Sequence, residues 1–179
     1  NYFNFGYVGI VGLFFLIIYS YLSNIFLVHS KNHNILVLIF GLISFLYFFV
    51  KYYNKEFFKK NFIFLILFFL ILSISLFIKK NHDDFPYYHF AYTFNLTQNS
   101  LDFGIGKINH GFRTPSSIFY LNSLFYLPIA EYYLFNFSAI FILGFSNIIL
   151  LKKISNFFEN FKHKKTKIDF INYLSLLCF

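Results

Sequence analysis

The chain has 179 residues, of which 58% are apolar, 12% are charged and 26% are aromatic. An ordinary soluble domain carries roughly a quarter charged residues and under half apolar ones, so this composition excludes that class. The high apolar content also excludes disorder, and a single cysteine, Cys178, excludes a disulfide scaffold. The composition therefore indicates an integral membrane protein.

Both ends of the sequence lead us to expect a piece of a longer membrane protein. The chain contains no Met, so residue 1 is not a translation start. It ends at Phe179, inside an apolar run that begins near residue 170.

Apolar runs taken in chain order predict an all-α, polytopic transmembrane helix bundle. A bilayer core of about 30 Å needs about 20 apolar residues in a helix. Runs of this kind lie near 5–28, 35–50, 61–78 and 132–151, and another starts at 170. We therefore expect one transmembrane domain over 1–179, with about four complete spans and the start of a fifth.

The first expected span carries three glycines on one face. Gly6, Gly9 and Gly12 are spaced three residues apart. Such a face can let a second helix pack closely, although the spacing differs from the four-residue dimer motif. Ordinary intramembrane glycines are the alternative interpretation.

Lysine-rich loops predict the orientation. Loop 51–60 has four lysines against Glu56, and loop 152–169 has six against Glu159 and Asp169. Because cytoplasmic loops carry the excess of Lys and Arg, both are expected in the cytoplasm. The segment 79–130, including loop 79–117, then faces outward. Topology and contact with membrane lipid explain these lysines without nucleic-acid binding.

The outward loop concentrates the residues that can do chemistry. It holds three of the seven acids, three of the six histidines and the only arginine, namely Asp83, Asp84, Asp102, His82, His89, His110 and Arg113. Functional residues are disproportionately found on loops that a rigid scaffold positions. This loop is therefore where we expect the site.

Two short helices are predicted in this outer segment. Asp84 can cap a helix with Pro86 in its first turn. Apolar residues 87, 90, 91 and 94 share one face of it, and His89, Thr93 and Thr97 share another, which is the pattern of an interfacial helix. Ser116 or Ser117 can cap a second helix over 118–127, stopped at Pro128. One long helix kinked at Pro128 is the competing interpretation. Residues 99–111, with three glycines, read as turns.

The glycines of the loop do not form a nucleotide-binding motif. Gly104-Ile-Gly106-Lys107 resembles part of a phosphate loop, but Leu101 and Ile108 stand where that motif needs Gly and Ser or Thr. Asn109 stands at the third glycine of the dinucleotide fingerprint.

Asp83 and Asp84 are adjacent carboxylates at a helix start, and three roles are open to them. One can act as a general base towards an acceptor hydroxyl. Both can hold a divalent metal ion, the one cofactor that these residues suggest. Alternatively they are a solvated helix cap that stabilises the dipole. His82 and His89 can join them as metal ligands, although a spacing of seven matches no recognised zinc pattern.

Arg113 and His110 are the second candidate feature. The planar fork of Arg matches phosphate and carboxylate geometry. Because lysine is otherwise the basic residue of this chain, the single Arg points to a need for that geometry. The alternative is a structural arginine that binds backbone carbonyls of the loop or Asp102.

Asp83-Asp84-Phe-Pro-Tyr-Tyr88-His89, followed by Gly104-x-Gly106-x-x-Asn109-x-x-x-Arg113, resembles a group of poorly characterised bacterial multi-spanning membrane proteins. These look like members of the glycosyltransferase C superfamily, whose enzymes use polyprenyl-phosphate-linked sugars. The resemblance covers about residues 80–130. In the better-known transferases the essential acid follows the first span, whereas here about three expected spans precede it.

The resemblance implies a transferase of envelope polysaccharide assembly in the bacterial inner membrane. It implies Asp83 or Asp84 as base or metal ligand, His89 orienting the acceptor or an acid, and Arg113 with His110 and Lys107 binding the carrier phosphate. The alternatives are an O-antigen polymerase or ligase, a transporter, and a non-catalytic membrane subunit.

Overall fold

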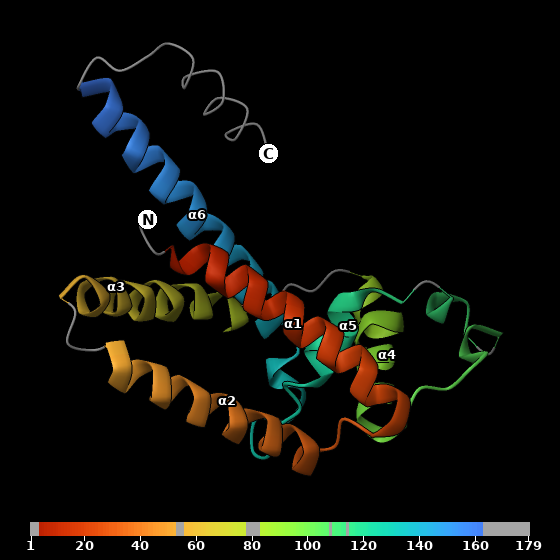
Figure 1. Cartoon of the computed structure of the whole chain (residues 1–179). Coiled ribbons are helices and arrows are strands. Elements are labelled where there is room, and N and C mark those ends of the chain that lie inside the picture. The colour runs from red at the N-terminus through yellow and green to blue at the C-terminus, as the bar shows by residue number, and fades with distance from the viewer. Residues whose placement is uncertain (1–3, 53–55, 78–82, 108, 114, 163–179) are drawn as a thin grey trace. The chain divides into compact units, whose positions relative to one another are not determined.

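The computed structural model describes residues 4–52, 56–77, 83–107, 109–113 and 115–162. Every regular element in these ranges is helical (Figure 1). The one other feature among the described residues is an isolated antiparallel bridge between Leu127 and Glu131. The expected all-α class is therefore confirmed for the described residues. The expected span from 170 and the candidate ligand His82 lie outside them.

Three of the described helices are long and apolar enough to cross a membrane. They are α1 (Phe5–Phe26), α2 (Lys31–Tyr52) and the apolar run Tyr132–Asn156, most of which is α6 (Phe137–Lys162). The expected span over 61–78 corresponds to α3 (Glu56–Ser73) and the 3₁₀ turn η1 (Ile74–Phe77), whose apolar run Phe62–Phe77 is shorter. The described residues thus contain three candidate membrane spans and one shorter apolar helix, which is compatible with a membrane protein.

Helix α2 begins four residues earlier than its apolar run predicts. Its first turn is Lys31-Asn-His-Asn34, which the hydropathy pattern leaves outside the span. This turn is helical because Asn34 is buried and its amide donates to the carbonyls of His29, Ser123 and Tyr126. Tertiary hydrogen bonds therefore extend the helix beyond its apolar core.

The described residues form two compact units, one within residues 4–13 and 141–162 and the other within residues 14–140. In the first unit, Gly6 and Gly9 of α1 lie against α6. A Cβ added at Gly9 would overlap the ring of Phe145, and one added at Gly6 would lie 2.5 Å from Ile149 Cγ1. Nothing lies within 4 Å of a Cβ added at Gly12. Close packing on the glycine face is confirmed at two of its three positions.

The second unit has its core between α4 (Phe90–Gln98) and α5 (Ser117–Ser123), which pack together (Figure 1). Tyr92, Leu96, Phe119 and Tyr120 are its buried centre. The hydroxyls of Tyr92 and Tyr120 lie 2.9 Å apart, so their polar ends are paired inside it. Burial and this hydrogen bond raise the pKa of Tyr92, which keeps the hydroxyl protonated.

The two predicted outer helices exist, with different ends. The Ser116 side chain caps α5 by accepting from the amide of Ile118, as predicted, but α5 ends at Ser123 rather than near 127. An irregular segment separates α5 from α6, so the kinked single helix is wrong. Ile129 and Glu131 in this segment have positive φ angles of 71° and 45°.

Candidate functional site

The first candidate helix starts with a widened turn. Asp84 is the residue before η2 (Phe85–His89), a π-helical turn that runs directly into α4. Its last bond joins the Phe90 amide to the Phe85 carbonyl, and Pro86, which has no amide hydrogen, occupies the first turn. Asp84 thus sits at the N-cap position as predicted, but its side chain makes no capping hydrogen bond. Single π-turns inside helices are frequent at functional sites.

Tyr88 ties Asp84 to the glycine-rich loop. Its hydroxyl donates to Asp84 Oδ2 over 3.3 Å. Its Cβ packs against Gly111 so closely that a Cβ added there would be 2.6 Å away. Burial and the Asp84 carboxylate raise the pKa of the Tyr88 hydroxyl, so it is a donor at neutral pH. The loop and the helix start are therefore joined at one side chain.

His89 follows on the same turn and is held by aromatic rings. Its imidazole lies edge-on to Tyr88, with ring centroids 4.3 Å apart, and 5.1 Å from Phe119. The Thr93 hydroxyl donates to the His89 carbonyl over 2.8 Å. The face that carries His89, Thr93 and Thr97 therefore points into the protein, where Thr93 and Thr97 are buried. An interfacial helix would turn this polar face towards solvent.

A cavity of about 380 Å³ opens beside His89. Five aromatic side chains contribute to its wall, namely Phe85, Tyr88, Phe90, Phe119 and Phe135. Six polar residues share the wall, namely His89, Thr93, Ser116, Asn122, Asn136 and Ser138. Apolar walls with a few placed polar groups are typical of a small-molecule site of this size. This cavity, with Tyr88 and Asp84 at its edge, is the candidate site.

One polar pair in the wall is deeply buried. The hydroxyl of Ser138, which is fully buried, donates to Asn122 Oδ1. The side chain of Asn122 is 8% exposed. In this arrangement Oδ1 is the accepting end of the Asn122 amide, and its Nδ2 is left for another partner.

The predicted phosphate ligands lie in the glycine-rich loop, and all three are exposed. Arg113 Nε donates to the Gly106 carbonyl over 3.1 Å, so the expected structural role is present. Its two terminal nitrogens have no hydrogen-bond partner among the described residues. Asn109 accepts from the Gly111 amide and caps the turn of His110. Lys107 ends another short turn of the loop.

The candidate metal ligands do not converge within the described part of the chain. Asp83 is exposed in the turn before Asp84. No group of three or more His, Cys, Asp or Glu side chains comes together among the described residues. The Tyr88 hydroxyl contacts Asp84, and the rings of Tyr88 and Phe119 contact His89.

Sequence reasoning missed a buried polar network where α1, α2, α4 and α5 meet. It includes Ser20, Ser23, Asn24, His29 and Asn34, all at most 9% exposed. The signal was present, because Ser20, Ser23 and Asn24 follow the i, i+3, i+4 spacing of one helix face. A polar face on a membrane helix turns towards protein.

His29 is the centre of this network and is neutral. The Ser123 hydroxyl donates to the Tyr120 carbonyl, so His29 Nδ1, 2.6 Å from it, must be the donor to Ser123. Nε2 is then the acceptor, 2.9 Å from the Ser23 hydroxyl, which lies farther, 3.3 Å, from its other acceptor, the Ser20 carbonyl. Burial, and then the parallel ring of His33 5.1 Å away, lower the pKa of His29 to about 4.

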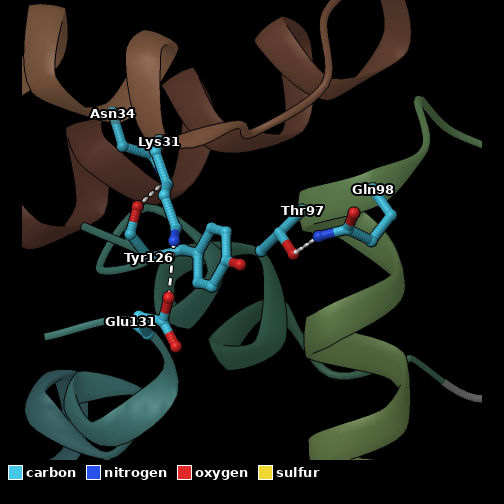
Figure 2. Close-up of polar contacts among 6 residues, drawn as sticks. All are labelled: Lys31, Asn34, Thr97, Gln98, Tyr126 and Glu131. Atoms are coloured by element: carbon cyan, nitrogen blue, oxygen red, sulfur yellow. Dashed lines mark hydrogen bonds and ion pairs between the residues drawn. The ribbon is translucent and has the colours of Figure 1, made fainter. Parts of the chain in front are cut away.

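The start of α2 is further held to the segment after α5 (Figure 2). Lys31 Nζ lies 2.6 Å from Glu131 Oε1 and 5.2 Å from the centre of the Tyr126 ring. Asn34 Nδ2 donates to the Tyr126 carbonyl, and Gln98 donates to the Thr97 hydroxyl on α4. The contacts of Lys31 and Asn34 position the segment that leads into the cavity wall at Phe135.

Comparison with known proteins adds no relative to this picture. The chain matches no family model, no curated protein and no solved structure.

Proposed function

We propose that the chain belongs to a glycosyltransferase C-like enzyme of bacterial envelope polysaccharide assembly. It would transfer a sugar from a polyprenyl-phosphate carrier to an acceptor at the outer face of the inner membrane. The observation that carries the proposal is the placement of Asp84, which is hydrogen-bonded to Tyr88 in the wall of a cavity that also contains His89. An acid held beside a pocket of sugar size is what a transferase needs.

Asp84 is the general base of this proposal. It takes the proton from an acceptor hydroxyl as that oxygen bonds to the anomeric carbon of the donor. The bond from this carbon to the phosphate oxygen breaks, and the lipid phosphate leaves with the electron pair. Tyr88 orients the carboxylate, and His89 orients the acceptor from the cavity wall.

Arg113 receives the leaving phosphate. Its Nε is fixed on the Gly106 carbonyl, which leaves the two terminal nitrogens for a bidentate contact with an oxyanion. Lys107 and His110 belong to the same exposed loop and add donors there. Negative charge grows on the phosphate as it departs, so these donors stabilise the transition state more than the ground state.

The membrane arrangement fits this direction of transfer. From the positive-inside rule, we assign the lysine-rich ends of the spans to the cytoplasm. In this assignment Phe62–Phe77 serves as a fourth, short span. The cavity, the Asp84 turn and the Arg113 loop then lie together at the outer surface. In this proposal the lipid carrier reaches them from the bilayer, and the exposed aromatic side chains of Tyr87 and Phe103 suit the membrane surface.

The test is a transfer assay with membranes that contain the full-length protein and a polyprenyl-phosphate donor carrying a radiolabelled sugar. Asp84→Asn should abolish labelled product, whereas Asp102→Asn, an exposed acid of the same loop, should leave it unchanged. Arg113→Lys should also abolish product, and Lys107→Arg should not. Equal membrane levels of all four variants are the control. Full product from Asp84→Asn and Arg113→Lys would refute the proposal.

A further inference from the structure

We infer that the cavity holds the neutral sugar ring itself, and that Asn122 selects it through a hydrogen bond from its amide nitrogen to a ring hydroxyl. This inference rests on the proposed function, because it names the part of the lipid-linked donor that enters the cavity. The phosphate stays outside, at Arg113.

The described wall of the cavity has no permanently charged side chain. None of the described residues that line it is Lys, Arg, Asp or Glu. A charged group that left water for such a surface would lose its hydration without gaining an opposite charge. The ligand part that enters is therefore uncharged, which assigns the phosphate to the exposed loop.

The aromatic rings suit the faces of a pyranose. Phe90 lies 5.9 Å from Phe135 between ring centroids, and Phe119 lies 5.1 Å from His89. The negative face of an aromatic ring attracts the weakly positive C–H groups that line one face of a sugar. The cavity volume of about 380 Å³ is at the small end of ligand sites, as a single ring requires.

Asn122 supplies the directional contact. Its Oδ1 accepts from the Ser138 hydroxyl, which turns the Nδ2 of the same amide away from Ser138. Its Nδ2 has no hydrogen-bond partner in the described part of the chain. This nitrogen is not among the fully buried polar atoms, and Asn122 lines the cavity. This nitrogen is therefore available to a ligand hydroxyl oxygen, which accepts its hydrogen bond in place of water.

Ser138 acts through Asn122. It is fully buried, and it donates its only hydroxyl hydrogen to the amide oxygen. Without it the amide can rotate and present its oxygen instead. Ser138 is therefore a positioning residue and Asn122 the residue that determines specificity.

The experiment is binding of methyl glycosides to the full-length protein in lipid nanodiscs, measured by saturation-transfer NMR. Sugar-headed detergents are avoided because they would compete. Methyl glucoside and methyl N-acetylglucosaminide should bind, and the anionic methyl glucuronide should not. Asn122→Leu, close in volume, should weaken neutral glycosides about tenfold or more. Ser138→Ala should weaken them less, and Asn99→Leu, an exposed amide outside the cavity, should have no effect.

Two results would overturn the inference. One is binding of the glucuronide as tight as that of the neutral glycosides, which needs no variant and so does not depend on variant folding. The other is an unchanged affinity in Asn122→Leu. Because binding is measured without transfer, neutral glycoside binding in a protein that transfers no sugar would refute the proposed function alone. Transfer without glycoside binding would refute this inference alone.

Discussion

The hydroxyl of Tyr88 donates to Asp84 Oδ2 over 3.3 Å, while the Cβ of the same tyrosine lies against Gly111. One side chain thus joins the acid at the helix start to the loop that carries Arg113. Base and phosphate ligand belong to one local structure in our account, because both depend on how Tyr88 is packed.

Removing this hydroxyl should slow transfer without unfolding the protein. Tyr88→Phe leaves the ring against Gly111 and deletes the bond that orients Asp84, so we expect kcat/KM to fall about three- to tenfold. Tyr87→Phe is the matched control, since Tyr87 is 75% exposed. The transfer assay measures both, and an equal rate in the two variants would show that Tyr88 does not orient the base.

A methyl group on the packed glycine face of α1 should destabilise its contact with α6. Gly9→Ala drives a Cβ into the Phe145 ring, and overpacking of this kind costs about 1–3 kcal/mol. Gly12→Ala adds the same methyl group where nothing lies within 4 Å and should be neutral. The midpoint of unfolding in SDS, followed by circular dichroism, separates the two variants. Equal midpoints would contradict the observed packing.

Acid should destabilise the fold through His29. Its pKa is about 4 in the folded protein against an ordinary 6.5, so between these values the unfolded state binds more protons. Stability is therefore complete above pH 6.5 and falls as the pH drops towards 4, by on the order of 3 kcal/mol. Melting temperatures from pH 7.5 to 4 should show this slope.

His29→Gln should flatten the acid slope and lower stability at pH 7.5. The exposed His110 provides the control, because His110→Gln should keep the slope of the unchanged protein. A His29→Gln protein with the full slope would place the titration elsewhere.

Backbone strain after α5 should be relieved by glycine. Ile129 is fully exposed with φ at 71°, where a β-branched residue is strongly disfavoured. Ile129→Gly should raise the melting temperature, with a gain of about 1 kcal/mol after the entropy of glycine in the unfolded chain is counted. Ile129→Val keeps the β-branch and should gain nothing. A lower melting temperature in Ile129→Gly would mean that the side chain itself stabilises the segment.

The sequence predicts the elements of this fold better than their contacts. Apolar runs locate α1, α2 and the span of α6, and Ser116 and Asp84 mark the starts of the outer helices. The hydropathy pattern does not predict the first turn of α2, Lys31–Asn34. This turn is stabilised by hydrogen bonds from the Asn34 amide to carbonyls 89 and 92 residues away in the sequence. Such long-range hydrogen bonds leave no local pattern.

The candidate site was predictable in part. The concentration of acids, histidines and the single arginine identifies the outer segment, and the face of His89, Thr93 and Thr97 is visible in the spacing. Which way that face points is not, since a polar face can turn to solvent or to a protein cavity. Asn122 and Ser138 lie in apolar runs and become informative only once α5 and the start of α6 form one wall.

The most direct test of the central claim is photolabelling of the cavity. A polyprenyl-phosphate sugar with a diazirine on the sugar is irradiated with the full-length protein in nanodiscs, and labelled peptides are mapped by mass spectrometry. Our account predicts labels within 85–93, 116–122 and 135–139, which line the cavity, and these labels should be removed by unlabelled donor. Competed labels confined to other segments, or labels in these three that the donor does not displace, would contradict it.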